Sequence, residues 1–384
     1  MKRIVSLLIA LLLVVPALVA CGNKNTPEET TPDNTVNNTP TEKTYTVAIA
    51  VDSAVNASNK VSNTALVLVL DDAGKIVAAR FDAAEVTPSL EEGAIVAVPS
   101  VQTKVEKGDK GVAANIAKLA NDLLARQGLT TADVEGLGIG SPGMIDSNEG
   151  NVVYANNLGW ENFRICDELS RLLGGITVKI GNDANVAALG EVKFGAARNY
   201  NNAVMITLGT GVGGGIVLDG KIVEGNRGAG AELGHIVIVK DGEQCSCGRR
   251  GCFEAYSSAT ALIRDTKRAM EAHPDSKMWE IGSIDAVGGR TVFDYAPIDP
   301  YAKAVLDSYI EHLACGLINY ANIFRPEVIL LGGGVCAQGD NLIKPLQAIM
   351  NKEIYAGDKG PQVPILIAEL ENSAGLLGAA ALLM

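Results

Sequence analysis

The stretch "NAVMITLGTGVGGGIVLDGKIVEG", residues 202–225, places β-branched and apolar residues on both sides of a run of glycines. This pattern predicts a strand, a glycine-rich loop, a second strand, a turn and a third strand. Gly209, Gly211 and Gly214 also match G-x-G-x-x-G, but the dinucleotide fingerprint requires a helix after its glycines. Here the strand-like "GIVLDGKIV" follows, so the sequence excludes that fold.

A glycine-rich hairpin can nevertheless hold a phosphate, because backbone N–H groups approach an anion closely where no side chain intervenes. Gly209, Thr210 and Gly211 form the predicted loop, and Thr210 adds a hydroxyl group. A tight hairpin without a ligand is the alternative. The glycines in "LGGGV", residues 332–334 of the chain, follow a buried strand and offer a second place for backbone contact with a ligand.

Strands and helices alternate around this stretch, which predicts an α/β fold. "TYTVAIAV" and "TALVLVLD" are strand-like, "VAANIAKLANDLLARQG" has helical spacing, and "ITVKIGNDANVAALGEVKFGAA" indicates a strand, a loop and a helix. Further helices are predicted over 257–273 and 301–324. "LVLDDAGKIV" is echoed by "IVLDGKIV", so two duplicated halves, each beginning with a β-meander, are expected to form two lobes with a cleft between them.

The N-terminus has the pattern of an export signal. Lys2 and Arg3 precede a nearly continuous apolar run that ends in "LVAC". "LVAC" resembles a lipobox, which implies a signal peptide over 1–20 and lipid attachment at Cys21; a chance apolar start is the alternative. Residues 21–44 are rich in Thr, Asn, Pro and Glu and are expected to form a flexible tether, which predicts a membrane-anchored lipoprotein.

Charge and composition narrow the class of ligand. The chain has 384 residues, 47% of them apolar and 20% charged, with a formal net charge of -12. No block of Lys and Arg interrupts this acidity, so nucleic-acid binding is not expected. A ligand that carries phosphate would have to be bound by backbone amides or by a metal ion.

Three cysteines and a histidine have the spacing of a metal site: His235-x9-Cys245-x-Cys247-x4-Cys252. Cysteines two apart rarely form a disulfide with each other, and three cysteines leave an odd thiol. Three thiolates and one imidazole complete the tetrahedral set that zinc prefers. The sequence therefore predicts a zinc knuckle, whereas the remaining thiols, Cys166, Cys315 and Cys336, are predicted to lie in the core.

Several carboxylates accompany these glycines and cysteines. Asp183 in "GNDAN" follows a predicted strand and is a candidate general base; the alternative is that it caps the following helix. Glu232 and His235 in "GAELGH" are three residues apart, and Glu254 lies just beyond the cysteines. Acids and amides with little basic charge suit a polyhydroxyl ligand such as a sugar.

Taken together, these motifs resemble the ROK family of bacterial sugar kinases, repressors and related proteins over about residues 111–384, and the ROK glucokinases in particular. The matching stretches are "GIGSPGMID", "GNDANVAALGE", "ITLGTGVGGGIVLDGKIVEGNRGAGAELGHI", "CSCGRRGCFEAYSS", "PEVILLGGGV" and "SAGLLGAAAL". The pairing of "GAELGH" with the cysteine motif is highly specific.

This resemblance implies a two-lobed, actin-like ATPase fold of the hexokinase and RNase H type that closes on a hexose and ATP. It implies that Asp183 deprotonates the 6-hydroxyl group of the sugar, with glucose the first candidate. Other hydroxyl groups would be held by Asn182, Glu232, His235 and Glu254.

For the cofactors, the resemblance implies that Mg²⁺ bridges the ATP phosphates and that a structural zinc lies on His235, Cys245, Cys247 and Cys252. It also implies a homodimer or homotetramer. The positions implied for ATP binding are Gly209, Thr210, Gly211 and Gly213 for the phosphates, and Gly333 and Gly334 near the adenosine.

The N-terminal part departs from the family pattern. ROK kinases carry a D-x-G-G-T loop in their first hairpin, whereas this chain has "AVDSAVNASNKVSNTALV", in which no glycine follows Asp52. Residues 45–110 form a divergent β-rich segment that faintly resembles a repeat of exported FMN-binding-like lipoproteins. The resulting hypothesis is that a lipoprotein head has been joined to a ROK body that lost its first hairpin.

The sequence is therefore consistent with two hypotheses about function. The first is an ATP-dependent hexose kinase. The second is a membrane-anchored, catalytically impaired sugar-binding lipoprotein or a chimeric gene product. If the N-terminus is an artefact of the gene model or of a fusion, a cytoplasmic location is expected instead.

Overall fold

The computed structural model describes residues 46–55, 60–70, 76–82, 96–97, 101–104, 108–126, 129–155, 158–371 and 373–384. The predicted signal peptide, Cys21 and the tether over 21–44 lie outside these ranges. Within the ranges, no helix is both long and apolar enough to cross a membrane.

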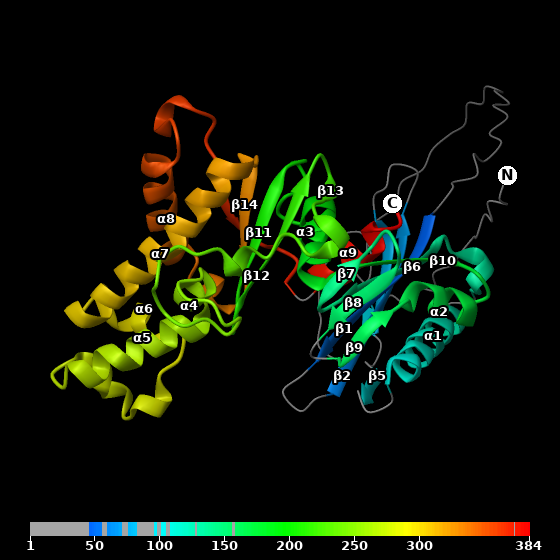
Figure 1. Ribbon diagram of the computed structural model, residues 1–384, viewed down its shortest axis with the longest axis horizontal. Coiled ribbons are helices and arrows are strands. Elements are labelled where there is room, and N and C mark those ends of the chain that lie inside the picture. The colour runs from blue at the N-terminus through cyan, green and yellow to red at the C-terminus, as the bar shows by residue number, and fades with distance from the viewer. Residues whose placement is uncertain are drawn as a thin grey trace, which may run out of the picture.

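The first lobe is built on a sheet that begins with an antiparallel meander (Figure 1). Its strands lie in the order β10-β6-β1-β2-β3-β4, with β5 paired to β2, and β6 and β10 continue the sheet in parallel beyond β1. The bounds are β1 Thr46–Val55, β2 Lys60–Leu70, β3 Ile76–Asp82, β4 Val96–Ala97, β5 Val101–Lys104, β6 Gly136–Ser141 and β10 Thr177–Asn182.

The second lobe repeats this arrangement. Its sheet has the order β13-β12-β11-β14-β15: an antiparallel meander, then two strands parallel to its first strand. The echoed segments "LVLDDAGKIV" and "IVLDGKIV" occupy the same place, between the second and third strands of each meander. The bounds are β11 Ala203–Leu208, β12 Val212–Leu218, β13 Lys221–Ile222, β14 Val328–Gly332 and β15 Ile365–Ile367.

The hypothesis that the chain lost its first hairpin is contradicted by the backbone of the N-terminal segment. Strands β1 and β2 pair over ten positions, and β1 pairs with β6 from Ile49↔Leu137 to Asp52↔Gly140. The segment over 45–110 therefore contributes strands to the same sheet as the body. Where the family pattern has its glycine loop, β1 continues to Val55 and β2 begins at Lys60; residues 56–59 lie outside the described part.

Helices cover both faces of the first sheet. Along β6, Leu137 and Ile139 face the core shared with α1 (Gly108–Arg126) and α2 (Ile165–Leu172), since alternate residues of a strand point to opposite faces. Gly138 faces the other side and lies against the backbone of α9 (Ser373–Ala381). A small antiparallel sheet completes the lobe: β7 Met144–Asp146, β8 Asn151–Ala155 and β9 Trp160–Phe163.

The second lobe has a large helical core beside its sheet. Buried aliphatic residues of β11 and β14 pack with side chains of α5, α7 and α8. The helices are α4 Glu254–Ser257, α5 Ala259–Ala272, α6 Thr291–Tyr295, α7 Pro300–Phe324 and α8 Asp340–Glu353. Of the three predicted core thiols, Cys166 and Cys336 are buried, whereas Cys315 on α7 is only partly buried.

Helix α3 (Asp183–Phe194) lies between the lobes and crosses α9 at backbone distance. A Cβ atom at Gly378 would overlap the carbonyl group of Val186, and one at Gly190 would overlap that of Ala374. The glycines of "AALGE" and "LLGAA" thus allow two helices from distant parts of the chain to touch.

Replacing Gly378 by Ala should force α3 and α9 apart. We expect Gly378→Ala to lower the free energy of unfolding by roughly 1–3 kcal/mol, the usual cost of overpacking, measured by chemical denaturation. Gly289→Ala is the matched control, because nothing lies within 4 Å of a Cβ atom there. Equal effects of the two substitutions would contradict this account of the crossing.

Candidate functional site

One pocket brings together residues from both lobes. Its lining includes Asn182 and Asp183 from the β10–α3 junction, Gly213 from β12 and Glu232 from the loop after β13. Four residues predicted to bind sugar or nucleotide are therefore adjacent. The full lining is Gly143, Asn182, Asp183, Ala184, Asn185, Val212, Gly213, Gly214, Gly228, Gly230, Ala231, Glu232 and Leu233, which includes no Lys or Arg.

Asp183 is the first residue of α3, and Asn182 is the N-cap. The side-chain oxygen of Asn182 accepts hydrogen bonds from the N–H groups of Ala184 at 3.0 Å and Asn185 at 3.2 Å. The alternative that Asp183 caps the helix is therefore wrong, since the preceding residue has that role. Asn182 also donates to the carbonyl oxygen of Gly143 at 3.1 Å, which ties the end of β10 to the turn after β6.

The pocket changes the acidity of Asp183. The residue as a whole is exposed, but its carboxyl group lies among the pocket atoms, and this burial raises the pKa of the carboxyl above its ordinary value. The N–H of Ala184 donates to the carboxylate at 2.9 Å and acts in the opposite direction. An acid with a raised pKa at a pocket wall is suited to taking up a proton.

The glycines of β12 allow close packing. A Cβ atom at Gly214 would lie 2.7 Å from Leu233, and one at Gly215 would lie 2.7 Å from Ala188 of α3. A Cβ atom at Gly213 would lie 2.7 Å from the Thr207 hydroxyl oxygen. The strand must therefore lack a side chain at Gly215 for α3, with Asp183 at its start, to lie against the second lobe.

The first residues of α5 donate hydrogen bonds to carbonyl groups of the loop over 209–211. The Gly209 carbonyl oxygen accepts from the N–H of Ala259 at 2.9 Å, and the Thr210 carbonyl oxygen accepts from the Thr260 hydroxyl at 2.8 Å. Within the described residues, the N–H groups of Thr210 and Gly211 have no hydrogen-bond partner. This arrangement leaves backbone donors available to an anion.

The second glycine turn lies beside this loop. Strands β11 and β14 are parallel, so Leu208, which ends β11, and Gly333, which follows β14, lie at the same edge of the sheet, where ligands of open α/β sheets bind. Gly333 has φ +93°, and a Cβ atom there would overlap the Leu208 carbonyl group. Nothing lies within 4 Å of a Cβ atom at Gly334, so this turn presents open backbone.

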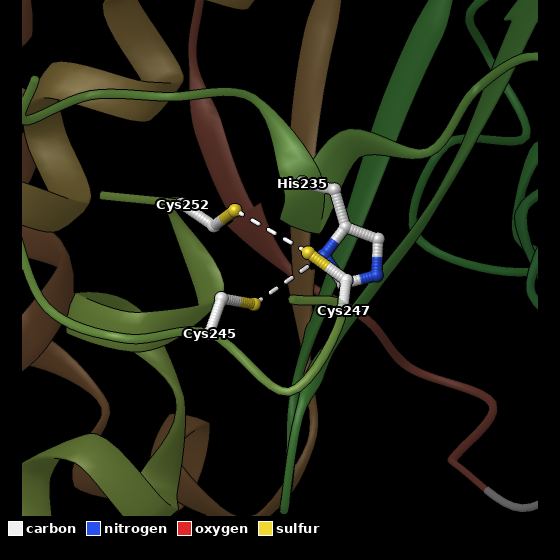
Figure 2. Close-up of side chains that lie close together, drawn as sticks. All are labelled: His235, Cys245, Cys247 and Cys252. Atoms are coloured by element: carbon white, nitrogen blue, oxygen red, sulfur yellow. Dashed lines mark hydrogen bonds between the residues drawn. The ribbon is translucent and has the colours of Figure 1, made fainter. Parts of the chain in front are cut away.

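The predicted metal ligands converge (Figure 2). The ligand atoms of His235, Cys245, Cys247 and Cys252 all lie within 4.8 Å of one another. The sulfur atoms of Cys247 and Cys252 are 3.7 Å apart, as are the Cys245 sulfur and Nδ1 of His235. Bonds of about 2.3 Å at tetrahedral angles place sulfur atoms roughly 3.8 Å apart, whereas a disulfide requires about 2.05 Å. The cluster could therefore hold a four-coordinate metal ion.

Two predicted sugar ligands lie at this cluster instead of in the pocket lining. His235 turns Nδ1 towards the sulfur atoms, which leaves Nε2 for another partner. Glu254, the first residue of α4, accepts a hydrogen bond from the N–H of Val212 at 2.9 Å and one from the Ser246 hydroxyl at 2.9 Å. It thus connects the cysteine cluster with the end of the glycine loop.

Sequence reasoning missed the contact that docks the loop over 224–232 on β7. Arg227 pairs with the buried Asp146 at 3.4 Å, and the Ser147 hydroxyl donates to Glu224. Burial raises the pKa of the Glu224 carboxyl. A Cβ atom at Gly228 would overlap the Ile145 backbone, so Glu232 is reached by a loop that lies directly on the first lobe.

Asn185 was also missed. It lies in the first turn of α3, lines the pocket, and has a buried side-chain oxygen without a hydrogen-bond partner in the described structure. Its spacing of three residues from Asn182 in "GNDAN" was the available signal, because positions i and i+3 share a helix face.

Comparison with known proteins agrees with this architecture. A family model described as the ROK family matches residues 82–384, which begins earlier than the boundary expected at residue 111. A glucokinase of Halalkalibacterium halodurans is 36% identical over 290 residues, which cover 74% of this chain and 87% of the relative. The xylose repressor of Bacillus subtilis is 28% identical over 249 residues, covering 63% of this chain and 59% of the repressor.

A solved structure has the same fold. The ROK family glucokinase of Streptomyces griseus, crystallised with glucose and AMPPNP, is 31% identical and has a TM-score of 0.61. The match covers 88% of this chain and 98% of that chain. These findings confirm the expected actin-like α/β fold.

The raised pKa of Asp183 predicts a gain of stability when its charge is removed. The contribution of the protonated carboxyl is fully present below the pKa of the unfolded chain and is lost as pH rises through the folded pKa. We therefore expect Asp183→Asn to have a higher free energy of unfolding than the native chain at about pH 7.5, and this difference to vanish as pH falls towards about 4.

Asp340→Asn is the matched control for this measurement. Asp340 is likewise the first residue of a helix, but its carboxylate is paired with Lys344 at 2.7 Å, so no comparable gain is expected. Denaturation curves across this pH range that show Asp183→Asn to be destabilised at neutral pH would contradict the burial argument.

Proposed function

This chain belongs to the ROK family, and from that premise we propose that it catalyses the ATP-dependent phosphorylation of a hexose, with glucose as the first substrate to test, at the 6-hydroxyl group. The observation that carries this proposal is that Asp183, with its raised pKa, shares one pocket with a glycine-rich strand, and that the backbone N–H groups of the preceding loop have no partner among the described residues.

In this proposal Asp183 accepts the proton of the attacking hydroxyl group. Asn182 and Glu232 line the same pocket and would hold other hydroxyl groups, joined by His235 through Nε2 and by Glu254. These side chains orient the sugar so that its 6-oxygen points at the terminal phosphate of ATP. Phosphoryl transfer depends mainly on such positioning and on electrostatic stabilisation.

The phosphates of ATP would lie on the loop over 209–211 and beside Gly213, with the adenosine near Gly333 and Gly334. The backbone N–H groups of Thr210 and Gly211, which have no partner within the described residues, would provide direct contacts to the phosphate oxygens. Mg²⁺, arriving with ATP, would neutralise the remaining charge.

We further propose that the cysteine cluster holds zinc. The fit rests on the chemistry of the donors, three thiols and an imidazole, and on their separations of 3.7 Å. Burial raises the pKa of the Cys252 thiol, and a bound cation would favour its thiolate form. The bound ion would fix His235 and the chain that leads to Glu254.

The kinase proposal is tested by coupling ADP formation to hexose addition with the purified full-length chain. We expect turnover with ATP, Mg²⁺ and at least one hexose, glucose being tried first. Asp183→Asn should lower kcat on the order of 10²- to 10⁴-fold, the usual contribution of a general base, while sugar binding measured by calorimetry is retained.

Asp340→Asn should retain native turnover. Sugar binding by the native chain without ADP formation from any hexose would reject the kinase proposal and favour a sugar-binding protein. Equal loss of binding and turnover in Asp183→Asn would show that Asp183 is not the base.

The zinc proposal is tested by metal analysis. We expect about one zinc per chain, with Cys247→Ser markedly depleted and Cys315→Ser unchanged, because only the first thiol belongs to the four-ligand set. The two serine variants are matched in chemistry. A metal-free protein with a disulfide between two of the cluster cysteines would overturn the assignment.

A further inference from the structure

The carboxylate of Glu254 lies between the metal cluster and the glycine loop. One oxygen, Oε2, accepts from the N–H of Val212 at 2.9 Å, and the other, Oε1, accepts from the Ser246 hydroxyl at 2.9 Å. The Cys245 thiol also lies 3.6 Å from Oε1. A single side chain therefore contacts both the cluster and the loop.

The loop is fitted closely to this carboxylate. Val212 pairs with Leu208 at the base of the hairpin, so the N–H held by Glu254 marks the point where the loop ends. Any Cβ atom at Gly211 would collide with Oε2, which means that the loop backbone lies directly on the carboxylate. Movement of Glu254 would therefore break the hydrogen bond that holds the Val212 N–H at the end of the loop.

Ser246 is well placed to control Glu254. It lies between two metal ligands, Cys245 and Cys247, so metal bonds on both sides would fix its backbone. Hydrogen bonds to an ionised carboxylate are among the stronger ones in proteins. The other contacts that hold the loop, from Ala259 and Thr260, come from the chain just after the cluster.

We propose that Ser246 and Glu254 are positioning residues through which the metal cluster sets the conformation of the glycine loop, so that metal occupancy governs the affinity for the nucleotide. The proposal rests on the proposed function in taking this loop as the phosphate-binding element. The new part of the proposal is that the metal controls the conformation of this loop. This effect is separate from any contact between Glu254 and the sugar.

The first test is hydrogen exchange of the segment over 208–214 in the full-length chain. Val212 owes its protection to Glu254, so removing the metal with a chelator should speed exchange there. Ser246→Ala should speed it with the metal still bound. Ser170→Ala is the matched control, since its hydroxyl donates one hydrogen bond at 2.9 Å, to the Ile176 carbonyl oxygen in the other lobe.

The second test is the Kd of the Mg²⁺ complex of AMPPNP, measured by calorimetry with and without the metal. We expect Ser246→Ala to weaken binding roughly three- to tenfold, in line with the loss of one hydrogen bond to a charged group. Metal removal should weaken binding of the native chain at least as much. In the Ser246→Ala variant, metal removal should weaken nucleotide binding little further, because both changes act through the hydrogen bond between Ser246 and Glu254.

Three results would overturn the proposal. Metal removal could leave hydrogen exchange over 208–214 and the Kd for the nucleotide unchanged, or its effect on Kd could be strictly additive with that of Ser246→Ala. The metal-loaded native chain could also fail to bind the nucleotide. Circular dichroism of the metal-free chain identifies a general loss of folding, and in that case Ser246→Ala, which keeps the metal, decides. Nucleotide binding that responds to the metal without transfer to any hexose would reject the kinase proposal and leave this one standing.

Discussion

Helix α3 is held at backbone distance on two sides, and the geometry of the site depends on this constraint. On one side Gly215 of β12 admits the first turns of the helix; on the other, Gly190 and Gly378 bring it against α9. Because α9 lies on the first sheet and β12 belongs to the second, α3 is shared by the lobes. Asp183, at the start of this helix, therefore has its position fixed by both halves of the molecule.

Much of the fold could be predicted because its signals are local. The hairpin over 202–225 and the helices α5 and α7 all appear where the sequence pattern predicted them, and the β-meander expected at the start of each half is present. The short echo between the halves was a true sign of duplication. The first hairpin was misjudged because its loop lacks the glycines of the family pattern, whereas strand pairing depends on backbone register and tolerates such a change.

The site was predictable where one residue type carries the chemistry. The converging ligands of the cysteine cluster follow from spacing alone, and Asp183 and Glu232 were expected near one another. The roles that depend on long-range contacts could not be foreseen. Nothing in the sequence places Ser246 against Glu254, or Arg227 against Asp146, because these pairs arise only when separate segments dock.

The way in which the glycine loop is held has a consequence for motion between the lobes. Its carbonyl groups accept hydrogen bonds from residues of the second lobe, and the turn at Gly333 packs on the same strand end, so the loop and this turn are both held on the second lobe. The β7 surface and the turn at Gly143 belong to the other body. Hinge motion between the lobes would therefore alter the width of the pocket that both lobes line, while the glycine loop and the turn at Gly333 keep their positions relative to each other.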